Sequence, residues 1–235
     1  MKLLTFAWVK DIPLKILLVS VLFLVSVLLF GFLVDEVIFE KESLFDNRVF
    51  DFFHGYTTPA LVHLAVFLSF FGSHLFFIPA YLLLCAYYFF FGKKKRLAID
   101  ILIIGITSTL LMFFLKDIFH RHRPDLPLIK TLNNYSFPSG HSLCSFVFFS
   151  ILVYITWLSK INRTWKWVLS VFFLLFSICI GLSRIVLRYH FASDVLAGFS
   201  LGFAWVLFSL WALNKISNRR HQDPAAIQTV SVGKT

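Results

Sequence analysis

The sequence predicts an all-α integral membrane protein, a single domain over residues 1–235 that crosses the bilayer with six transmembrane helices. Of its residues, 59% are apolar and only 14% are charged, whereas about a quarter of the residues of a soluble domain are charged. The chain also contains 31 Phe, 7 Tyr and 6 Trp residues. A soluble domain of this size cannot bury so much apolar surface, so the composition excludes soluble and disordered proteins.

Six apolar runs are long enough to cross a bilayer, which takes about 20 residues of helix. The first run is too long for the core of a signal peptide and lacks a small-residue cleavage site. The apolar stretch 61–71 has only about half the required length and follows an aromatic segment, so we expect interfacial or re-entrant helices in the first outward loop. The six predicted spans are Ile16–Val34, His74–Phe91, Leu97–Leu115, Ser142–Leu158, Trp167–Ser183 and Phe191–Leu213.

Basic residues at the ends of these runs set the expected orientation. With six spans, the clusters at 93–96 and 160–166 share one side with both termini, and that side carries 14 of the 22 basic residues. The positive-inside rule makes this side cytoplasmic, with residues 214–235 as a polar cytoplasmic tail. The 14 residues are Lys2, Lys10, Lys15, Lys93, Lys94, Lys95, Arg96, Lys160, Arg163, Lys166, Lys215, Arg219, Arg220 and Lys234.

The net charge of +10 is interpreted as membrane-surface charge, with no nucleic-acid partner. Two outward segments, 116–141 and 184–190, are nevertheless basic. Positive charge on the outward side opposes the positive-inside rule, which indicates that these segments bind an anion. The three cysteines lie in apolar runs and have no metal-binding spacing, so we expect neither a disulfide framework nor a metal site.

The first candidate motif places Lys116 at the end of the third span and Arg123 seven residues later. Seven residues are about two helical turns, so both cations face one direction if the helix continues. Pro124 is then expected to stop that helix. An ordinary basic flank of a membrane span is the alternative, and Arg121, His120 and His122 are expected only to add to the local potential.

The second motif opens the fourth span with Ser139, Gly140 and His141. The N-terminus of a helix presents free N–H groups and partial positive charge, which suits a phosphate. Ser139 is expected to cap the helix, Gly140 to let its backbone approach a ligand closely, and His141 to project toward the same anion. A plain turn with a helix cap is the alternative.

The third motif contains Arg184 and then His190 and Asp194, which are four residues apart at the start of the sixth span. On a helix this spacing brings the two side chains to one face. A carboxylate there holds one ring nitrogen and leaves the other free to act as a nucleophile. Asp194 lies in an apolar segment, where an unpaired carboxylate is costly, so we expect it to pair with His190.

These three elements resemble the type-2 phosphatidic acid phosphatase family, whose pattern is K-x6-R-P, then P-S-G-H, then S-R-x5-H-x3-D. Eleven specified positions match with every spacing kept, and the resemblance covers about residues 45–213. Soluble vanadate-dependent haloperoxidases share the pattern, but six spans argue against one of them here. The matching residues are Lys116, Arg123, Pro124, Pro138, Ser139, Gly140, His141, Ser183, Arg184, His190 and Asp194.

The resemblance implies a metal-free, cofactor-free lipid phosphatase. His190 would attack phosphorus to form a phosphohistidine, Asp194 would orient it, and His141 would act as general acid and then as general base. The phosphate oxygens would be held by Lys116, Arg123, Ser139, Gly140 and Arg184.

The expected partners are the bilayer and a lipid phosphate, in a bacterial cytoplasmic membrane with the site facing the periplasm. The candidate substrates are an isoprenoid (undecaprenyl) pyrophosphate, phosphatidylglycerophosphate, phosphatidic acid and phosphorylated lipid A. Two other functions remain open at this point: phosphate transfer from one lipid to another through the same site, and a transporter that only binds the anion. A transporter is disfavoured because its charges are expected near the bilayer midplane, often in paired repeats.

Overall fold

The computed structural model describes residues 14–41, 43–92 and 94–222. This part of the chain is helical, and six of its helical segments are long and apolar enough to cross a membrane, which confirms the predicted fold class. The helices are α1 (Leu14–Val34), α2 (Leu44–Tyr56), α3 (Pro59–Phe70), α4 (His74–Ala86), α5 (Lys95–Phe119), α6 (Gly140–Leu158), α7 (Arg163–Val186) and α8 (Ala192–Gln222), with π-helical turns η2 (Asp35–Phe39) and η3 (Tyr87–Phe91) after α1 and α4.

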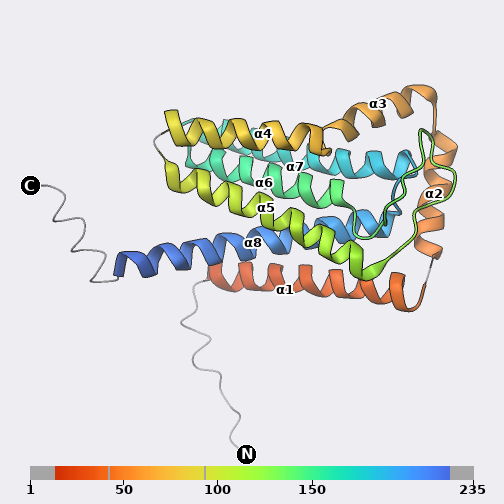
Figure 1. Ribbon diagram of the computed structural model, residues 1–235, viewed down its shortest axis with the longest axis horizontal. Helices are drawn as coiled ribbons and strands as arrows, with labels where there is room; N and C mark the ends of the chain where they lie inside the picture. The colour runs from red at the N-terminus through yellow and green to blue at the C-terminus, as the bar shows by residue number, and fades with distance from the viewer. Residues whose placement is uncertain (1–13, 42, 93, 223–235) are drawn as a thin grey trace, which may run out of the picture.

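Apart from α2, the helices run roughly along one direction, and the bundle therefore has two distinct ends (Figure 1). One end holds the start of α1, the end of α8 and the basic α4–α5 and α6–α7 turns; the other holds α2 and the long loop between α5 and α6. The structure thus brings the basic clusters at 94–96 and 160–166 to the same end of the bundle, as the predicted six-span topology requires. The predicted cytoplasmic residues Lys2, Lys10, Lys93 and Lys234 lie outside the described residues, and the predicted tail continues α8 as far as Gln222.

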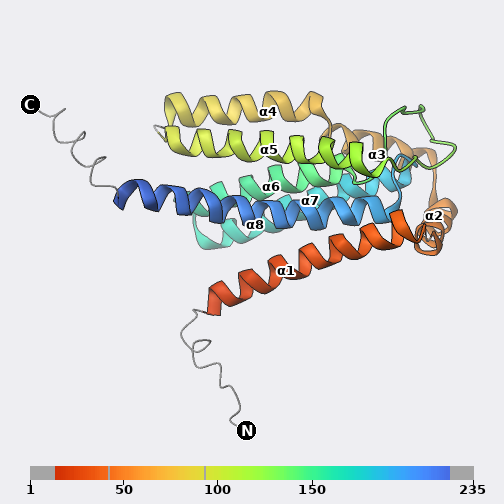
Figure 2. The same ribbon diagram turned by 60° about the horizontal axis from the view of Figure 1, so that its bottom comes forward.

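Helix α6 lies at the centre and packs against α5, α7 and α8, while α1 runs along α8 at the edge of the bundle (Figure 2). The contact between α6 and α8 is close because Gly198 and Gly202 carry no side chain. A Cβ at Gly198 would lie 2.6 Å from the Ser139 carbonyl oxygen, and one at Gly202 would lie 3.3 Å from the Leu143 carbonyl oxygen. These glycines therefore let α8 approach the N-terminal turn of α6.

The segment 61–71 differs from the prediction of a separate interfacial or re-entrant helix. It forms most of α3, which packs against α7 and leads into α4 to give one apolar segment, Pro59–Phe91. The break between α3 and α4 includes Gly72, where a Cβ would lie 2.7 Å from the His141 ring and 2.6 Å from Ile180. Among the helices that the structure describes, only α2, which lies across the end of the bundle, has the position expected of an interfacial helix (Figure 1).

The end of α5 also corrects a prediction. The helix ends at Phe119, before it reaches Arg123, because His120 adopts a left-handed conformation with φ of 49° and its N–H bonds to the Lys116 carbonyl. The chain then runs as a loop in which the Arg121 carbonyl accepts from the Ser136 N–H at 2.8 Å. Pro124 therefore lies beyond the helix end instead of causing it, and Arg123 approaches Lys116 by way of a loop.

Candidate active site

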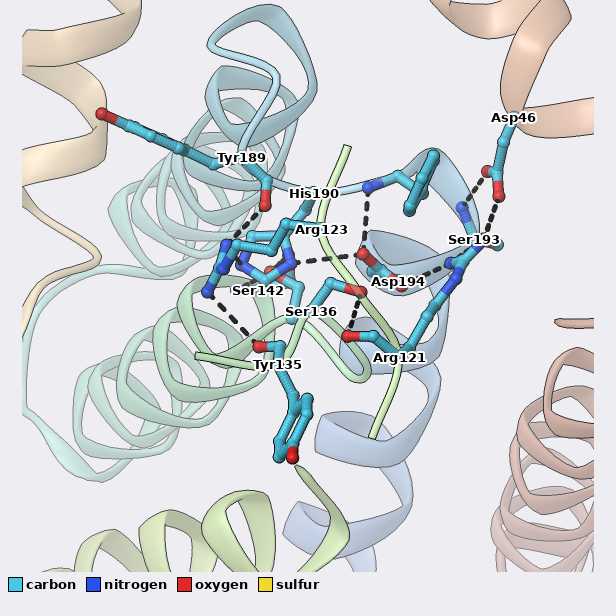
Figure 3. A network of polar contacts seen from close by, with 12 residues as sticks. Asp46, Arg121, Arg123, Tyr135, Ser136, Ser142, Tyr189, His190, Ser193 and Asp194 are labelled. Atoms are coloured by element: carbon cyan, nitrogen blue, oxygen red, sulfur yellow. Dashed lines mark hydrogen bonds and ion pairs between the residues drawn. The ribbon is translucent and has the colours of Figure 1, made fainter. Parts of the chain in front are cut away.

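The structure brings the residues of all three motifs together at the end of the bundle that carries α2. Figure 3 shows Arg123, His190 and Asp194 from this group. They come from the last turn of α5, the loop after it, the first turn of α6, the last turn of α7, the α7–α8 turn and the first turn of α8. Six of the eight predicted site residues line one cavity, and Ser139 and Asp194 are fully buried beside it. The six are Lys116, Arg123, Gly140, His141, Arg184 and His190.

His190 and Asp194 form the predicted pair. The Nδ1 atom of His190 lies 3.3 Å from Asp194 Oδ2, and the two side chains are 2% and 0% exposed. Asp194 Oδ2 also accepts the Phe191 N–H at 2.9 Å, in the manner of a capping box that reaches back to the start of its helix. The imidazole is therefore oriented by an acceptor that is itself fixed to the backbone.

The environment of His190 favours its neutral form. Burial, and then the charges of Arg123, Lys116 and Arg184, hold the pKa of His190 well below its ordinary value. With the Nδ1 proton donated to Asp194, the Nε2 lone pair faces Arg123, whose Nη1 lies 3.3 Å away. An unprotonated nitrogen at the edge of a cationic pocket is what a nucleophile for phosphorus requires.

Three cations line the cavity together with His190, and each is held by its own partners. Arg123 donates to the Tyr189 carbonyl and, at 2.8 Å, to Asn134 Oδ1. Lys116 donates to the Tyr135 carbonyl at 2.5 Å. Arg184 donates to the Ser69 hydroxyl from α3, but its buried Nε has no hydrogen-bond acceptor within residues 14–222 that the structure describes. A buried donor of this kind calls for an anionic partner.

The N-terminus of α6 forms the remaining wall. Ser139 caps the helix as predicted, since its hydroxyl accepts from the Ser142 N–H at 3.4 Å and from the Ser142 hydroxyl at 3.0 Å. The Ser139 N–H donates to the Asp194 carbonyl at 3.0 Å, which ties α6 to α8. Gly140 and His141 line the cavity, whereas the Ser139 hydroxyl faces its own helix. A contact of this hydroxyl with phosphate therefore stays a prediction.

The cavity has a volume of about 700 Å³ and two chemically different parts. One part carries the three cations together with His141 and His190. The other extends between α4 and α5 and is lined by the apolar side chains of Phe77, Ile78, Leu82, Leu102, Ile106 and Phe113. This combination suits a phosphate attached to a hydrocarbon chain. Within the described residues, no group of three or more His, Cys, Asp or Glu side chains could hold a metal ion.

Sequence reasoning missed three residues that hold the site together. Ser69 binds Arg184, Asn134 binds Arg123, and Asp46 binds Arg121, which in turn binds Asp194. Asp46 and Ser69 lie in α2 and α3, far in sequence from every motif, so no local pattern pointed to them. The only available signal was Arg121, a cation inside the first motif at a position that the motif does not specify.

The family and several relatives are recognisable by comparison. The sequence profile of the PAP2 superfamily matches residues 96–217. The phosphatidylglycerophosphatase B of Bacillus subtilis (strain 168) is 31% identical over 149 residues, which cover 61% of this chain and 71% of that protein. The crystal structure of a transmembrane PAP2-type phosphatidylglycerolphosphate phosphatase from Bacillus subtilis has a TM-score of 0.72 at 25% identity, over 84% of this chain and 96% of its own.

A more distant likeness supports the fold alone. The crystal structure of Aquifex aeolicus LpxE has a TM-score of 0.51 at 20% identity, over 69% of this chain and 93% of its own. The profile match covers more than half of the chain and includes all three motifs, from Lys116 to Asp194. The chain therefore belongs to the PAP2 superfamily. Within this superfamily it is one of the integral membrane lipid phosphatases.

Proposed function

We propose that this protein is a metal-independent phosphatase that hydrolyses a lipid phosphate through a phosphohistidine on His190. The observation that carries the proposal is the placement of His190, with Nδ1 on the buried Asp194 and Nε2 at the edge of a cavity that three cations line. A nucleophile, its orienting carboxylate and three cations thus share one site.

The first half-reaction transfers the phosphoryl group to the enzyme. The Nε2 lone pair of His190 forms a bond to phosphorus, and the bond from phosphorus to the ester oxygen breaks. His141 gives its proton to the departing oxygen, which leaves as the lipid alcohol. Asp194 stabilises the positive charge that appears on the imidazole when its second nitrogen becomes substituted.

The second half-reaction returns the enzyme to its starting state. His141, now unprotonated, removes a proton from water while the water oxygen attacks phosphorus. The P–N bond breaks, inorganic phosphate leaves, and the electron pair returns to Nε2 of a neutral His190. Lys116, Arg123, Arg184 and the N-terminus of α6 stabilise the charge on the equatorial oxygens in both steps, which is the role that a metal ion plays in many other phosphatases.

Phosphatidylglycerophosphate is the first candidate substrate because the sequence match and the solved structure from Bacillus subtilis are both named for this activity. The cavity supports a substrate of this class, since its apolar part between α4 and α5 suits acyl chains while the cationic part suits a phosphomonoester. We place the site at the outer, periplasmic face of a bacterial cytoplasmic membrane, because the basic turns at the opposite end of the bundle fit the positive-inside rule.

The test measures phosphate release by the purified full-length protein in detergent with EDTA. The panel is phosphatidylglycerophosphate, phosphatidic acid, an undecaprenyl pyrophosphate and phosphorylated lipid A. We expect release from phosphatidylglycerophosphate to be the fastest, to persist in EDTA and to be lost in His190→Ala. Activity that EDTA removes and Mg²⁺ restores would contradict the metal-free mechanism, and turnover by His190→Ala would contradict the assignment of the nucleophile.

A further inference from the structure

Arg121 lies two residues before Arg123 but points away from the cavity, toward two buried carboxylates (Figure 3). Its Nη1 donates to Asp194 Oδ1 at 2.5 Å and to the Ser193 hydroxyl at 2.9 Å, and its Nη2 donates to Asp46 Oδ2 at 2.8 Å. The guanidinium also lies 4.0 Å from the centre of the Phe191 ring. Its side chain is only 13% exposed, so Arg121 is part of the protein interior and not a general surface charge.

Asp46 completes the cluster from α2. Its side chain is 1% exposed, and it accepts the Ser193 N–H at 2.8 Å and the Ser193 hydroxyl at 2.6 Å in addition to Arg121. Asp46 therefore satisfies a free N–H group in the first turn of α8, on the residue directly before Asp194. Through these bonds α2 is attached to the backbone that carries His190 and Asp194.

The two oxygens of Asp194 have different partners. Oδ2 accepts from His190 Nδ1 and from the Phe191 N–H, while Oδ1 accepts from Arg121. Without Arg121 the carboxylate would keep only the contacts on one oxygen and would be free to rotate. In the described part of the chain, the Asp194 carboxylate forms ion pairs with Arg121 and His190 alone. Without Arg121, this buried negative charge would keep only His190 as a partner.

We infer that Arg121 and Asp46 are positioning residues for the reaction: Asp46 fixes Arg121, Arg121 fixes the Asp194 carboxylate, and Asp194 orients the His190 nucleophile. This inference rests on the proposed function, because it needs His190 to be the nucleophile. Arg121 is not among the residues that line the cavity, and both of its terminal nitrogens are engaged by protein acceptors. It therefore acts on the nucleophile and not on the phosphate, in contrast to its neighbour Arg123.

The experiment is a double-mutant cycle between Arg121→Gln and Asp194→Asn, with steady-state and single-turnover rates measured on an aryl phosphate. A good leaving group keeps the slow variants measurable. We expect Arg121→Gln to lower kcat about 10- to 100-fold, the range that corresponds to the loss of one hydrogen bond to a charged group. KM should stay within about twofold, because the phosphate-binding cations are untouched.

In the Asp194→Asn background, Arg121→Gln should change the rate by no more than about twofold, because Arg121 then has no carboxylate at position 194 to hold in place. Arg121→Lys should restore part of kcat, because one donor to Asp194 remains. Asp46→Asn should lower kcat in the same direction as Arg121→Gln but by less. If Arg121→Gln does not fold, the cycle is run with Arg121→Lys in both backgrounds.

Two matched controls separate this role from a structural one. Arg188 also bridges to α2, through His54 at 3.2 Å, and it is not among the described partners of the Asp194 carboxylate. Asp51 is an exposed carboxylate of the same helix as Asp46. Arg188→Gln and Asp51→Asn should keep wild-type kcat and KM. Thermal stability in detergent is measured for every variant.

The outcomes are distinguishable. Wild-type kcat in Arg121→Gln or Arg121→Lys, together with loss of activity in Asp194→Asn, would overturn this inference and leave the proposed function intact. Equal effects of Arg121→Gln in the two backgrounds would also overturn it, as would a defect confined to KM. Full activity in both Asp194→Asn and His190→Ala would instead overturn the proposed function.

Discussion

His190 has an anion on one ring nitrogen and a cation at the other, and this asymmetry sets its protonation. Burial and the surrounding charges of Arg123, Lys116 and Arg184 lower the pKa of His190. The unfolded chain binds that proton at the ordinary histidine pKa of about 6.5. The protein should therefore keep a neutral His190 below pH 6.5, and its stability should fall as the pH decreases from there toward the lowered folded-state pKa.

This prediction is measured by long-range ¹⁵N–¹H NMR of histidine-labelled protein in detergent between pH 8 and pH 5. We expect the His190 signals, assigned by their loss in His190→Gln, to show a neutral ring with the proton on Nδ1 at pH 5.5. A histidine peptide in the same buffer serves as the control. A His190 ring that becomes doubly protonated at or above pH 6.5 would contradict the description of the site.

His141 carries the second prediction at the residue scale. His141→Ala should slow hydrolysis of a lipid phosphate by about 10² to 10⁴, the usual contribution of general acid–base catalysis. The defect in phosphoenzyme formation should shrink for a nitrophenyl phosphate, whose leaving group needs less protonation. The measurement is single-turnover release of the leaving group for both substrates. An equal defect with both would assign His141 to positioning and not to proton transfer.

At the scale of the helices, the close contact of α6 and α8 holds the phosphate-binding N-terminus beside the catalytic pair. Gly198→Ala would place a methyl group 2.6 Å from the Ser139 carbonyl oxygen, and backbone cannot move aside as a flexible side chain can. We expect it to destabilise the protein by about 1 to 3 kcal/mol, the usual cost of overpacking, and to lower activity at the same time.

The matched control is Gly31→Ala in α1, where a Cβ would meet nothing within 4 Å. This variant should keep activity and be neutral or slightly more stable, because Ala favours a helix over Gly. Thermal unfolding in detergent and phosphate release are measured for both variants. Wild-type stability and activity in Gly198→Ala would show that the contact between α6 and α8 does not position the site.

The helices also show which features the sequence could predict. Apolar runs of span length and the spacing of His190 and Asp194 are local patterns. The structure confirms the six spans and the contact of the two side chains, but His190 lies in the turn before α8 and not on one face of that helix, as the spacing had predicted. The end of α5 was misplaced because a left-handed His120 leaves no mark in composition, whereas Pro124 does. The ion pair of Asp46 with Arg121 joins residues 75 positions apart, and only the folded chain brings them together.

At the scale of the whole molecule, the prediction concerns the side of the membrane on which the site lies. Single cysteines at positions 160 and 130 report on opposite ends of the bundle, in a background with Cys85, Cys144 and Cys179 replaced. The residues that they replace, Lys160 and Lys130, are both exposed. An impermeant thiol reagent applied to intact cells should label position 130 and not position 160, because the basic α6–α7 turn is predicted to be cytoplasmic. Labelling at position 160 alone would reverse the orientation.

The central claim is that phosphate passes through a covalent bond to His190, and trapping that intermediate tests it most directly. Protein with His141→Ala, which should slow hydrolysis of the P–N bond, is mixed with a ³²P-labelled aryl phosphate and quenched in alkaline detergent, because phosphohistidine is labile in acid. We expect ³²P label on the peptide that contains His190, and no label in the double variant that carries both His141→Ala and His190→Ala. Label that persists without His190, or turnover by the wild-type protein with no labelled intermediate at any quench time, would contradict the account.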